Sequence, residues 1–276
     1  MDGVLLVAKP AGVTSHDVVE TLRRTHGAKT GHAGTLDPFA TGLLVVLVGR
    51  ATRLQQYMVG LPKAYRAVAR LGATSDTGDP TGKVSTTGAS VGEQSLRRGI
   101  ERLTGEIEQR VPAYSAVKVG GERLYRKARR GEEVDAPVRR VTIERFELAR
   151  FDAEAQEADL FVRCSSGTYI RQLVADLGEL CGAGAYCEQL ERTEVGPFSL
   201  AEADDQRLLP LIDALPLLPE HALTEADAES IRHGRAIENP GGVGEEGQAV
   251  RLTADHELLA VAVRRGDELK PETVLT

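Results

Sequence analysis

Apolar and polar residues follow clear patterns along the first fifty residues of the chain. Residues 3–8 form a short apolar run that predicts a strand. Thr14 and Asp17 have the spacing of a capping box, and the apolar positions that follow predict a helix to about Arg24. A second apolar run at 43–48 is expected to form a buried strand. The chain therefore begins with a strand, a helix and a second strand.

The middle of the chain shows both strand-like and helix-like spacing. Alternating residues predict three further strands, at 63–71, 138–150 and 157–164. Helical spacing predicts three helices, at 51–58, 93–103 and 168–180. The span 72–92, rich in Gly, Ser, Thr and Asp, is expected to be a long loop. Because strands and helices do not repeat strictly, we expect an α+β fold with a mixed, largely antiparallel sheet flanked by helices.

The C-terminal part has its own pattern. Residues 208–219 hold three prolines among leucines and predict a linker that packs on the core. Thr224 and Asp227 repeat the capping-box spacing, so a short helix is expected to follow. Residues 248–253 and 257–265 predict a hairpin. The chain is therefore expected to divide into a domain at 1–215 and a small β-rich domain at 220–276.

Composition indicates an aliphatic core. Hydrophobic residues make up 41% of the chain, aromatic residues only 4%, and tryptophan is absent. No apolar run reaches the roughly 18 residues of a membrane helix, and residues 1–7 lack the basic start of a signal peptide. The three cysteines match no zinc spacing and are expected to be reduced thiols. A cytoplasmic enzyme without a membrane partner is the resulting expectation.

Charge is divided unevenly between the two halves of the chain. Residues 1–150 carry 24 Lys and Arg against 16 Asp and Glu, a net charge of +8. Residues 151–276 carry 10 against 25. The basic half is expected to meet a polyanion, although clustered solvated faces would give the same count. The run at 123–130 is the densest, and as a helix it would align four cations that can follow phosphates. These four are Arg123, Arg126, Lys127 and Arg130.

The glycine-rich stretch at 31–42, GHAGTLDPFATG, is the most informative polar segment. Pro38 fixes its own backbone and biases Asp37 toward an extended conformation, while the glycines permit another backbone to approach closely. Because a buried strand follows at once, Asp37 is expected on a rigid loop, where reactive carboxylates are usually presented. A lone loop aspartate can also be a turn former or a helix N-cap.

Four further blocks stand in order around this loop. They are KPAGVTS at 9–15, YRA at 65–67, SGTYIR at 166–171, and LERT at 190–193 with Gly196 and Phe198. Together with the Asp37 loop, these blocks resemble the motifs of the TruB family of tRNA pseudouridine synthases, in the family's order. They cover most of the first 200 residues, so coincidence is a poor explanation of the resemblance.

The resemblance implies both a fold and an activity. It implies a pseudouridine synthase domain with an RNA-clamping thumb inserted at about 105–147, followed by a PUA-like RNA-binding domain. The activity is the conversion of the T-loop uridine at tRNA position 55 to pseudouridine, by breaking the bond from sugar to base, turning the base and rejoining it through carbon. Nothing is oxidised or added, so no cofactor and no metal are expected. The expected partner is the T-arm stem-loop of tRNA, bound by a monomer without guide RNA, and help with tRNA folding is also expected.

The resemblance assigns catalytic roles to Asp37, Tyr65 and Arg171. Asp37 would act as a nucleophile or as a base. Arg171 would pair with Asp37 and favour its charged form, because a guanidinium stabilises a nearby carboxylate. Tyr65 would stack on the target uracil or move a proton, although a tyrosine on an apolar strand face can also be core. His32 would fill the space left when the uridine flips out of its stack.

Other residues are expected to line the pocket or bind RNA. Lys9 would meet a phosphate or orient the Asp37 loop, whereas Tyr169 and Leu190 would form pocket walls or ordinary core. The four cations of the 123–130 run would position the RNA without reading its sequence. The C-terminal domain is acidic and is expected to add little affinity for phosphate.

Three rival hypotheses follow from the same residues. The protein could bind or fold RNA without turnover, or it could be a guide-RNA-dependent relative that works in a multiprotein particle. An aspartyl-phosphate transferase is the third, but a phosphate-cradling glycine loop with a lysine is not found in the sequence. Activity of the purified protein on bare tRNA, and its loss in Asp37→Asn, would separate these hypotheses.

Overall fold

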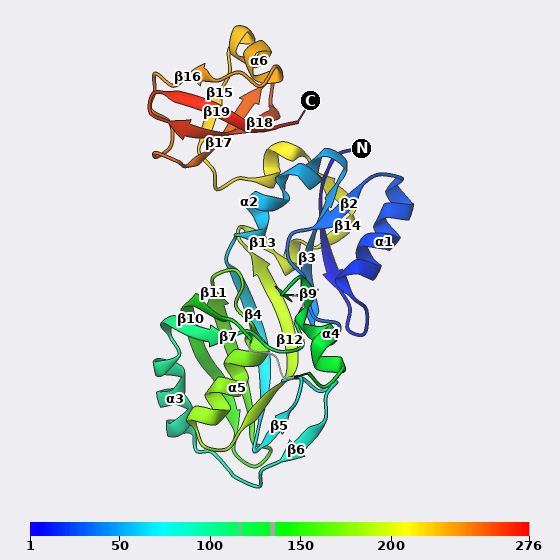
Figure 1. Cartoon of the computed structure of the whole chain (residues 1–276), viewed down its shortest axis with the longest axis vertical. Coiled ribbons are helices and arrows are strands. Elements are labelled where there is room, and N and C mark those ends of the chain that lie inside the picture. The colour runs from blue at the N-terminus through cyan, green and yellow to red at the C-terminus, as the bar shows by residue number, and fades with distance from the viewer. Residues whose placement is uncertain (116, 133–135, 276) are drawn as a thin grey trace.

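A computed structural model describes residues 1–115, 117–132 and 136–275. The chain forms a ten-stranded sheet and, at its C-terminal end, a separate five-stranded sheet (Figure 1). Helices flank the large sheet, whose strands are mostly antiparallel. The predicted α+β class is confirmed.

The main sheet has the order β14-β1-β3-β12-β4-β11-β10-β7, with β2 paired to β3 and β13 paired to β12. Its strands are β1 (Gly3–Lys9), β2 (Thr30–His32), β3 (Thr41–Val48), β4 (Lys63–Leu71), β7 (Gly105–Arg110), β10 (Val138–Asp152), β11 (Glu157–Cys164), β12 (Ala185–Val195), β13 (Phe198–Ser199) and β14 (Asp204–Leu209). Strands β3 and β12 pair in parallel at the centre of the sheet, through Thr41–Glu191 and Gly42–Arg192.

Strand β3 is apolar along almost its whole length because both of its faces are covered. Val46 shares one apolar cluster with Val19, which lies on the helix that precedes β3. Leu47 shares another cluster with Met58 and with Val261 of the C-terminal sheet. The apolar run that predicted a buried strand therefore reflects burial on two sides.

Three helices, at 15–26, 93–102 and 170–180, begin and end within about two residues of the predicted positions. The helix predicted at 51–58 is instead a 3-10 turn at 49–54 followed by a short helix at 55–59. The described residues form six helices. They are α1 (Ser15–His26), α2 (Gln55–Val59), α3 (Glu93–Arg102), α4 (Leu124–Arg129), α5 (Ile170–Leu180) and α6 (Glu225–Arg232), with the 3-10 turns η1 (Gly49–Leu54), η2 (Leu200–Glu202) and η3 (Leu211–Ala214). The predicted capping boxes at Thr14 and Thr224 are both present. Helix α5 buries its apolar side against the main sheet, which fixes the position of Arg171 in its first turn.

Two differences between the sequence analysis and the structure concern strands of the main domain. The expected 72–92 loop contains a short hairpin, β5 (Ala73–Ser75) with β6 (Val84–Thr86). Strand β12 was not predicted, although it is central to the sheet. Its pairing with β4 shifts register after Cys187 and after Arg192, and such bulges disrupt the two-residue alternation that marks a strand.

The C-terminal sheet has the order β15-β17-β18-β19-β16. Its strands are β15 (Glu220–Ala222), β16 (Ile237–Glu238), β17 (Ala249–Ala254), β18 (Glu257–Arg265) and β19 (Glu268–Val274). The predicted hairpin is the β17–β18 pair, whose turn places Asp255 and His256 at positive φ. The proline-containing linker packs on the core as predicted, with Ala214 and Leu215 buried.

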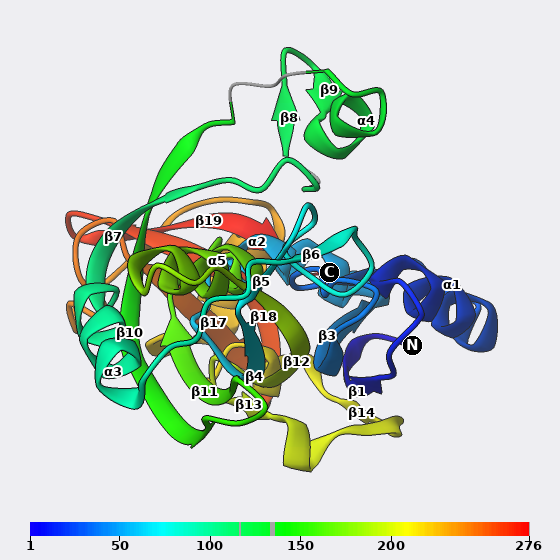
Figure 2. The ribbon, with the colours of Figure 1, turned by 90° about the horizontal axis from the view of Figure 1, so that it is seen from below.

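The described residues between β7 and β10, which lie within the predicted thumb and are called the thumb below, project from the body of the molecule (Figure 2). The thumb carries a small hairpin, β8 (Lys118–Val119) with β9 (Glu122–Arg123), and helix α4. The predicted helix over 123–130 is shortened to α4, with Arg123 extended before it, because Gly120 and Gly121 at positive φ turn the chain into the hairpin. The predicted stripe of four cations on one helical face is therefore not formed.

Candidate active site

The Asp37 loop is fixed by hydrogen bonds to residues of the KPAGVTS block at 9–15. The buried Ser15 hydroxyl accepts from the Leu36 N–H at 2.9 Å and donates to the Leu36 carbonyl at 3.1 Å. The Gly12 N–H donates to the Pro38 carbonyl at 2.8 Å. These bonds fix the residues on either side of Asp37, so the carboxylate stands on a rigid loop, as predicted.

Lys9 belongs to the same support. Its side chain is buried, and its ammonium donates to the carbonyls of Pro10, Val13 and Pro38 at 2.8, 2.9 and 3.4 Å. Burial lowers the pKa of this ammonium. Of the two roles expected for Lys9, these contacts support orientation of the loop, because three backbone oxygens already accept from the ammonium.

Arg171 meets Asp37 with the geometry expected of a charged pair. Its Nε donates to Asp37 Oδ2 at 2.8 Å, and its Nη2 donates to Asp37 Oδ1 at 3.3 Å. The Arg171 side chain is only 4% exposed, whereas that of Asp37 is 35% exposed. The guanidinium is therefore inside the protein, and the carboxylate that it holds is partly open to a ligand.

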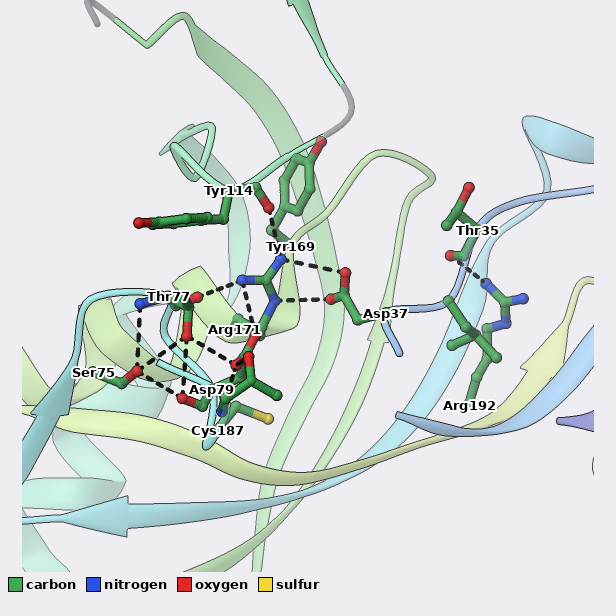
Figure 3. Close-up of polar contacts among 12 residues, drawn as sticks. Thr35, Asp37, Ser75, Thr77, Asp79, Tyr114, Tyr169, Arg171, Cys187 and Arg192 are labelled. Atoms are coloured by element: carbon green, nitrogen blue, oxygen red, sulfur yellow. Dashed lines mark hydrogen bonds and ion pairs between the residues drawn. The ribbon is translucent and has the colours of Figure 1, made fainter. Parts of the chain in front are cut away.

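A second carboxylate, that of Asp79, contacts the far side of the same guanidinium (Figure 3). Asp79 is buried, and its Oδ2 lies 3.2 Å from Arg171 Nη1, which also donates to the Thr77 carbonyl. The Asp79 Oδ1 accepts from the Thr77 hydroxyl at 2.8 Å and from the Thr81 N–H at 3.0 Å. Arg171 thus bridges the Asp37 loop and the β5–β6 hairpin.

Tyr114 and Tyr169 complete the surroundings of Arg171. The Tyr114 carbonyl accepts from Arg171 Nη2 at 3.2 Å, which ties the base of the thumb to the charged pair. Tyr169 is half-buried and precedes helix α5, where its N–H and carbonyl bond the Gln109 side chain at 2.8 and 3.1 Å. Figure 3 shows the side chain of Tyr169 beside Arg171.

Tyr65 and Leu190 lie in the main apolar core. Both are nearly buried and share one cluster with Leu36 of the Asp37 loop. Burial raises the pKa of Tyr65, so its hydroxyl remains protonated at neutral pH. The structure places Tyr65 as core, and a protonated phenol in that position can donate a hydrogen bond but is a poor base.

His32 ends strand β2 and lies on the same loop as Asp37. Its carbonyl accepts from the Gln55 side chain at 2.8 Å. Among the described residues, its buried Nδ1 has no hydrogen-bond partner. Burial, reinforced by the positive charge of Arg192, lowers the pKa of His32, so the ring is neutral at neutral pH. A flat, neutral ring suits insertion into an RNA stack.

The thumb cations fall into two groups. Arg123 and Arg126 are exposed and Lys127 is half-buried, so these side chains can reach a phosphate. Arg130 instead binds both carboxylate oxygens of Glu122, at 2.7 and 2.8 Å, and Glu132 at 2.6 Å. Its charge is already engaged within the thumb, which corrects its expected role as a free phosphate contact.

Sequence reasoning missed two charged residues of the site. Asp79 lies in a segment rich in Ser, Thr, Gly and Asp, where nothing distinguishes it from Asp76, which is exposed. Arg192 lies within the LERT block and was assigned no role, yet it is buried beneath the Asp37 loop. Strand β12 also carries Glu188, Glu191 and Glu194, so the local pattern did not mark Arg192 as a buried residue.

Comparison with known proteins places this arrangement in a family. A profile described as "TruB family pseudouridylate synthase (N terminal domain)" matches residues 22–170. The chain belongs to the TruB family of pseudouridylate synthases. It is accordingly an enzyme of the isomerase class that this family defines.

Relatives match over nearly the full chain. The tRNA pseudouridine synthase B of a Mycobacterium species (strain KMS) is 44% identical, over 94% of this chain and 91% of its own length. That of Nocardia farcinica is 43% identical, over 100% of this chain and 94% of its own length. That of an Arthrobacter species is 41% identical, over 99% and 96%.

Solved structures show the same TruB-type fold. A Cbf5–Nop10–Gar1 complex contains a chain with TM-score 0.77 and 25% identity, over 99% of this chain and 85% of that chain. An H/ACA RNP bound to a substrate RNA contains a chain with TM-score 0.76 and 23% identity, over the same shares. The C-terminal sheet fits the PUA-like domain of this fold. No helix among the described residues is long and apolar enough to cross a membrane.

Proposed function

We propose that the protein isomerises the T-loop uridine of tRNA, at position 55, to pseudouridine, with Asp37 as the reacting group. The observation that carries this proposal is the partly exposed Asp37 carboxylate, held at both oxygens by the buried Arg171. The names of relatives at 41–44% identity support tRNA as the substrate. In this proposal the enzyme works in the cytoplasm.

The geometry suits a reaction in which a base is detached and rejoined. A carboxylate fixed in orientation can attack the nucleoside or remove a proton, and neither step needs a redox group. The buried Arg171 orients the carboxylate and balances its charge, while the carboxylate itself stays partly open to a ligand. His32 would act before Asp37, by filling the space that the flipped uridine leaves in the RNA stack. Tyr65 would act after Asp37, by donating a proton or a hydrogen bond to the uracil.

The first experiment tests the role of Asp37. Asp37→Asn keeps the size of the side chain and removes its charge. We expect this variant to bind the T-arm stem-loop within about threefold of wild type and to form no pseudouridine in a tritium-release assay. A variant that turned over at the wild-type rate would refute the assignment, and loss of RNA binding in parallel would assign Asp37 to recognition.

A second experiment tests independence from guide RNA. The structural relatives include chains from H/ACA complexes, whereas the curated relatives are named as tRNA enzymes. We propose a stand-alone monomer, and the exposed thumb cations Arg123 and Arg126 supply a surface for tRNA without an added RNA. The purified protein should modify an isolated T-arm stem-loop. Activity that appeared only after a guide RNA and further proteins were added would contradict this proposal.

A further inference from the structure

The guanidinium of Arg192 is buried directly beneath the Asp37 loop. The residue is 1% exposed and is among the largest fully buried side chains of the protein. Its Nε donates to the Leu43 carbonyl at 2.8 Å, its Nη2 to the Gly34 carbonyl at 3.0 Å, and its Nη1 to the Thr35 carbonyl at 3.3 Å. Figure 3 shows Arg192 reaching Thr35 on the side of the loop away from Arg171. A single side chain thus connects the segment that precedes Asp37 with the segment that follows it.

The contacts of Arg192 differ from those of Arg171. Arg171 is neutralised by two carboxylates, whereas no carboxylate of the described residues lies within 4 Å of the Arg192 nitrogens. A buried cation without an anion is costly, and an apolar residue would fill a strand position at less cost. The compensating gain is that the guanidinium, with its five donors, satisfies the backbone carbonyls of Gly34, Thr35 and Leu43 at once.

The backbone of Arg192 also fixes the end of the loop. Gly42 has φ 107, and a Cβ on it would lie 2.3 Å from the Arg192 carbonyl oxygen. The same two residues face each other in the parallel β3–β12 contact. The side chain and the backbone of Arg192 therefore both constrain the backbone of the loop that carries Asp37.

We propose that Arg192 is a positioning residue for the reaction: its guanidinium holds both arms of the Asp37 loop so that the carboxylate stays in register with Arg171. Only the expected effect on the reaction rate rests on the proposed function. The hydrogen bonds from Arg192 to the loop form without substrate, and their effect on the loop can be measured without it.

The test compares two buried cations that neighbour the same loop. Arg192→Lys keeps the charge but leaves one nitrogen to serve three carbonyls. Lys63→Met is the matched control, because Lys63 is also buried, with its Cε 3.8 Å from a Cβ placed on Gly34, yet its ammonium donates to Val59 and Leu61, outside the loop. Both variants are expected to lose stability, and only Arg192→Lys is expected to lose the loop geometry.

Two readouts separate positioning from general destabilisation. In single-turnover pseudouridine formation, Arg192→Lys should be about 100-fold slower than wild type, since misplacement by about 1 Å costs that much, with T-arm binding within about threefold. Lys63→Met should stay within about threefold in both. In the protein without RNA, amide hydrogen exchange over 31–42 should be at least about tenfold faster in Arg192→Lys and unchanged in Lys63→Met.

The outcomes are decisive in each direction. The inference is overturned if Arg192→Lys keeps the wild-type rate and exchange, if both variants slow equally, or if binding falls in step with the rate. If Arg192→Lys does not melt cooperatively, Arg192→Gln gives the same comparison, and failure of both to fold would assign Arg192 to folding and overturn the inference. An inactive wild type with the expected exchange pattern would refute the proposed function while leaving the hold on the loop in place.

Discussion

Arg171 shows how a single side chain can organise a site from three segments. Its nitrogens contact Asp37 from one loop, Asp79 and Thr77 from a hairpin, and the Tyr114 carbonyl from the base of the thumb. A planar fork with five donors can serve all of these partners at once, whereas an ammonium is a single point of charge. The positions of these partners around position 171 therefore require an arginine and not a lysine.

Arg171→Lys is expected to lower the rate of pseudouridine formation by at least about 100-fold, because one nitrogen cannot bridge Asp37 and Asp79. Binding of the T-arm should remain within about threefold of wild type. Arg163→Lys is the matched control, since Arg163 also contacts two carboxylates, those of Glu144 and Glu194, but is 39% exposed. Its rate should change less than twofold. Single-turnover tritium release measures both variants, and equal rates would remove Arg171 from the mechanism.

The pairing of Asp37 with Arg171 was predicted from sequence, and the structure has the two side chains in contact. Asp79 and Arg192 were not predicted, because their importance depends on burial by segments distant in sequence. Asp79 is buried by Arg171, which lies 92 positions later, and Arg192 by a loop about 150 positions earlier. Local patterns carry no information about such contacts.

At the level of elements, prediction worked where one face of an element is regularly apolar. Strand β4 buries Tyr65, Ala67 and Leu71 on one side, as its alternation predicted, and α5 buries one helical side. Strand β12 failed because its bulges shift the alternation twice. The thumb helix failed because charge periodicity says nothing of the glycine turn that shortens it.

The thumb is the element through which phosphate contacts are expected to act. Arg126→Ala should weaken T-arm binding and reduce the slope of log K against log salt by up to about 1, as expected for one phosphate contact. Arg130→Ala should change this slope less, because its guanidinium is bound to Glu122 and Glu132. Arg97→Ala on α3 is the control for an exposed arginine elsewhere and should leave the slope unchanged. Titrations at several salt concentrations measure all three, and an unchanged slope in Arg126→Ala would contradict the role of α4.

For the whole molecule, the C-terminal sheet is a packing partner of the catalytic part. Leu258, Val261 and Leu275 share an apolar cluster with residues of β1, β3 and α2. Thr273 bonds Tyr57 at 3.0 Å, and Arg50 donates to the Leu275 carbonyl at 2.5 Å. Residues 220–275 carry twelve acidic against six basic side chains, so the segment is better suited to this contact than to phosphate.

Leu275→Ala is expected to reduce the free energy of unfolding by about 2–4 kcal/mol, because it leaves a cavity between the two sheets. The Leu275 side chain is almost fully buried, whereas Leu217 is 61% exposed. Leu217→Ala should therefore change the free energy of unfolding by less than about 0.5 kcal/mol. Urea unfolding measures both variants. Equal values for the two would show that the C-terminal sheet is not docked through this cluster.

The parallel contact of β3 with β12 joins positions 41–42 to positions 191–192. During synthesis the chain can build helix α1 and the first hairpins early, but β12 (Ala185–Val195) is complete only after about 195 residues have been joined. Until then Asp37 has neither Arg171 nor the support of Arg192. If the proposed function holds, an incomplete nascent chain that carries the exposed thumb can bind RNA before it is able to modify it, because the catalytic contacts form in one late step of folding.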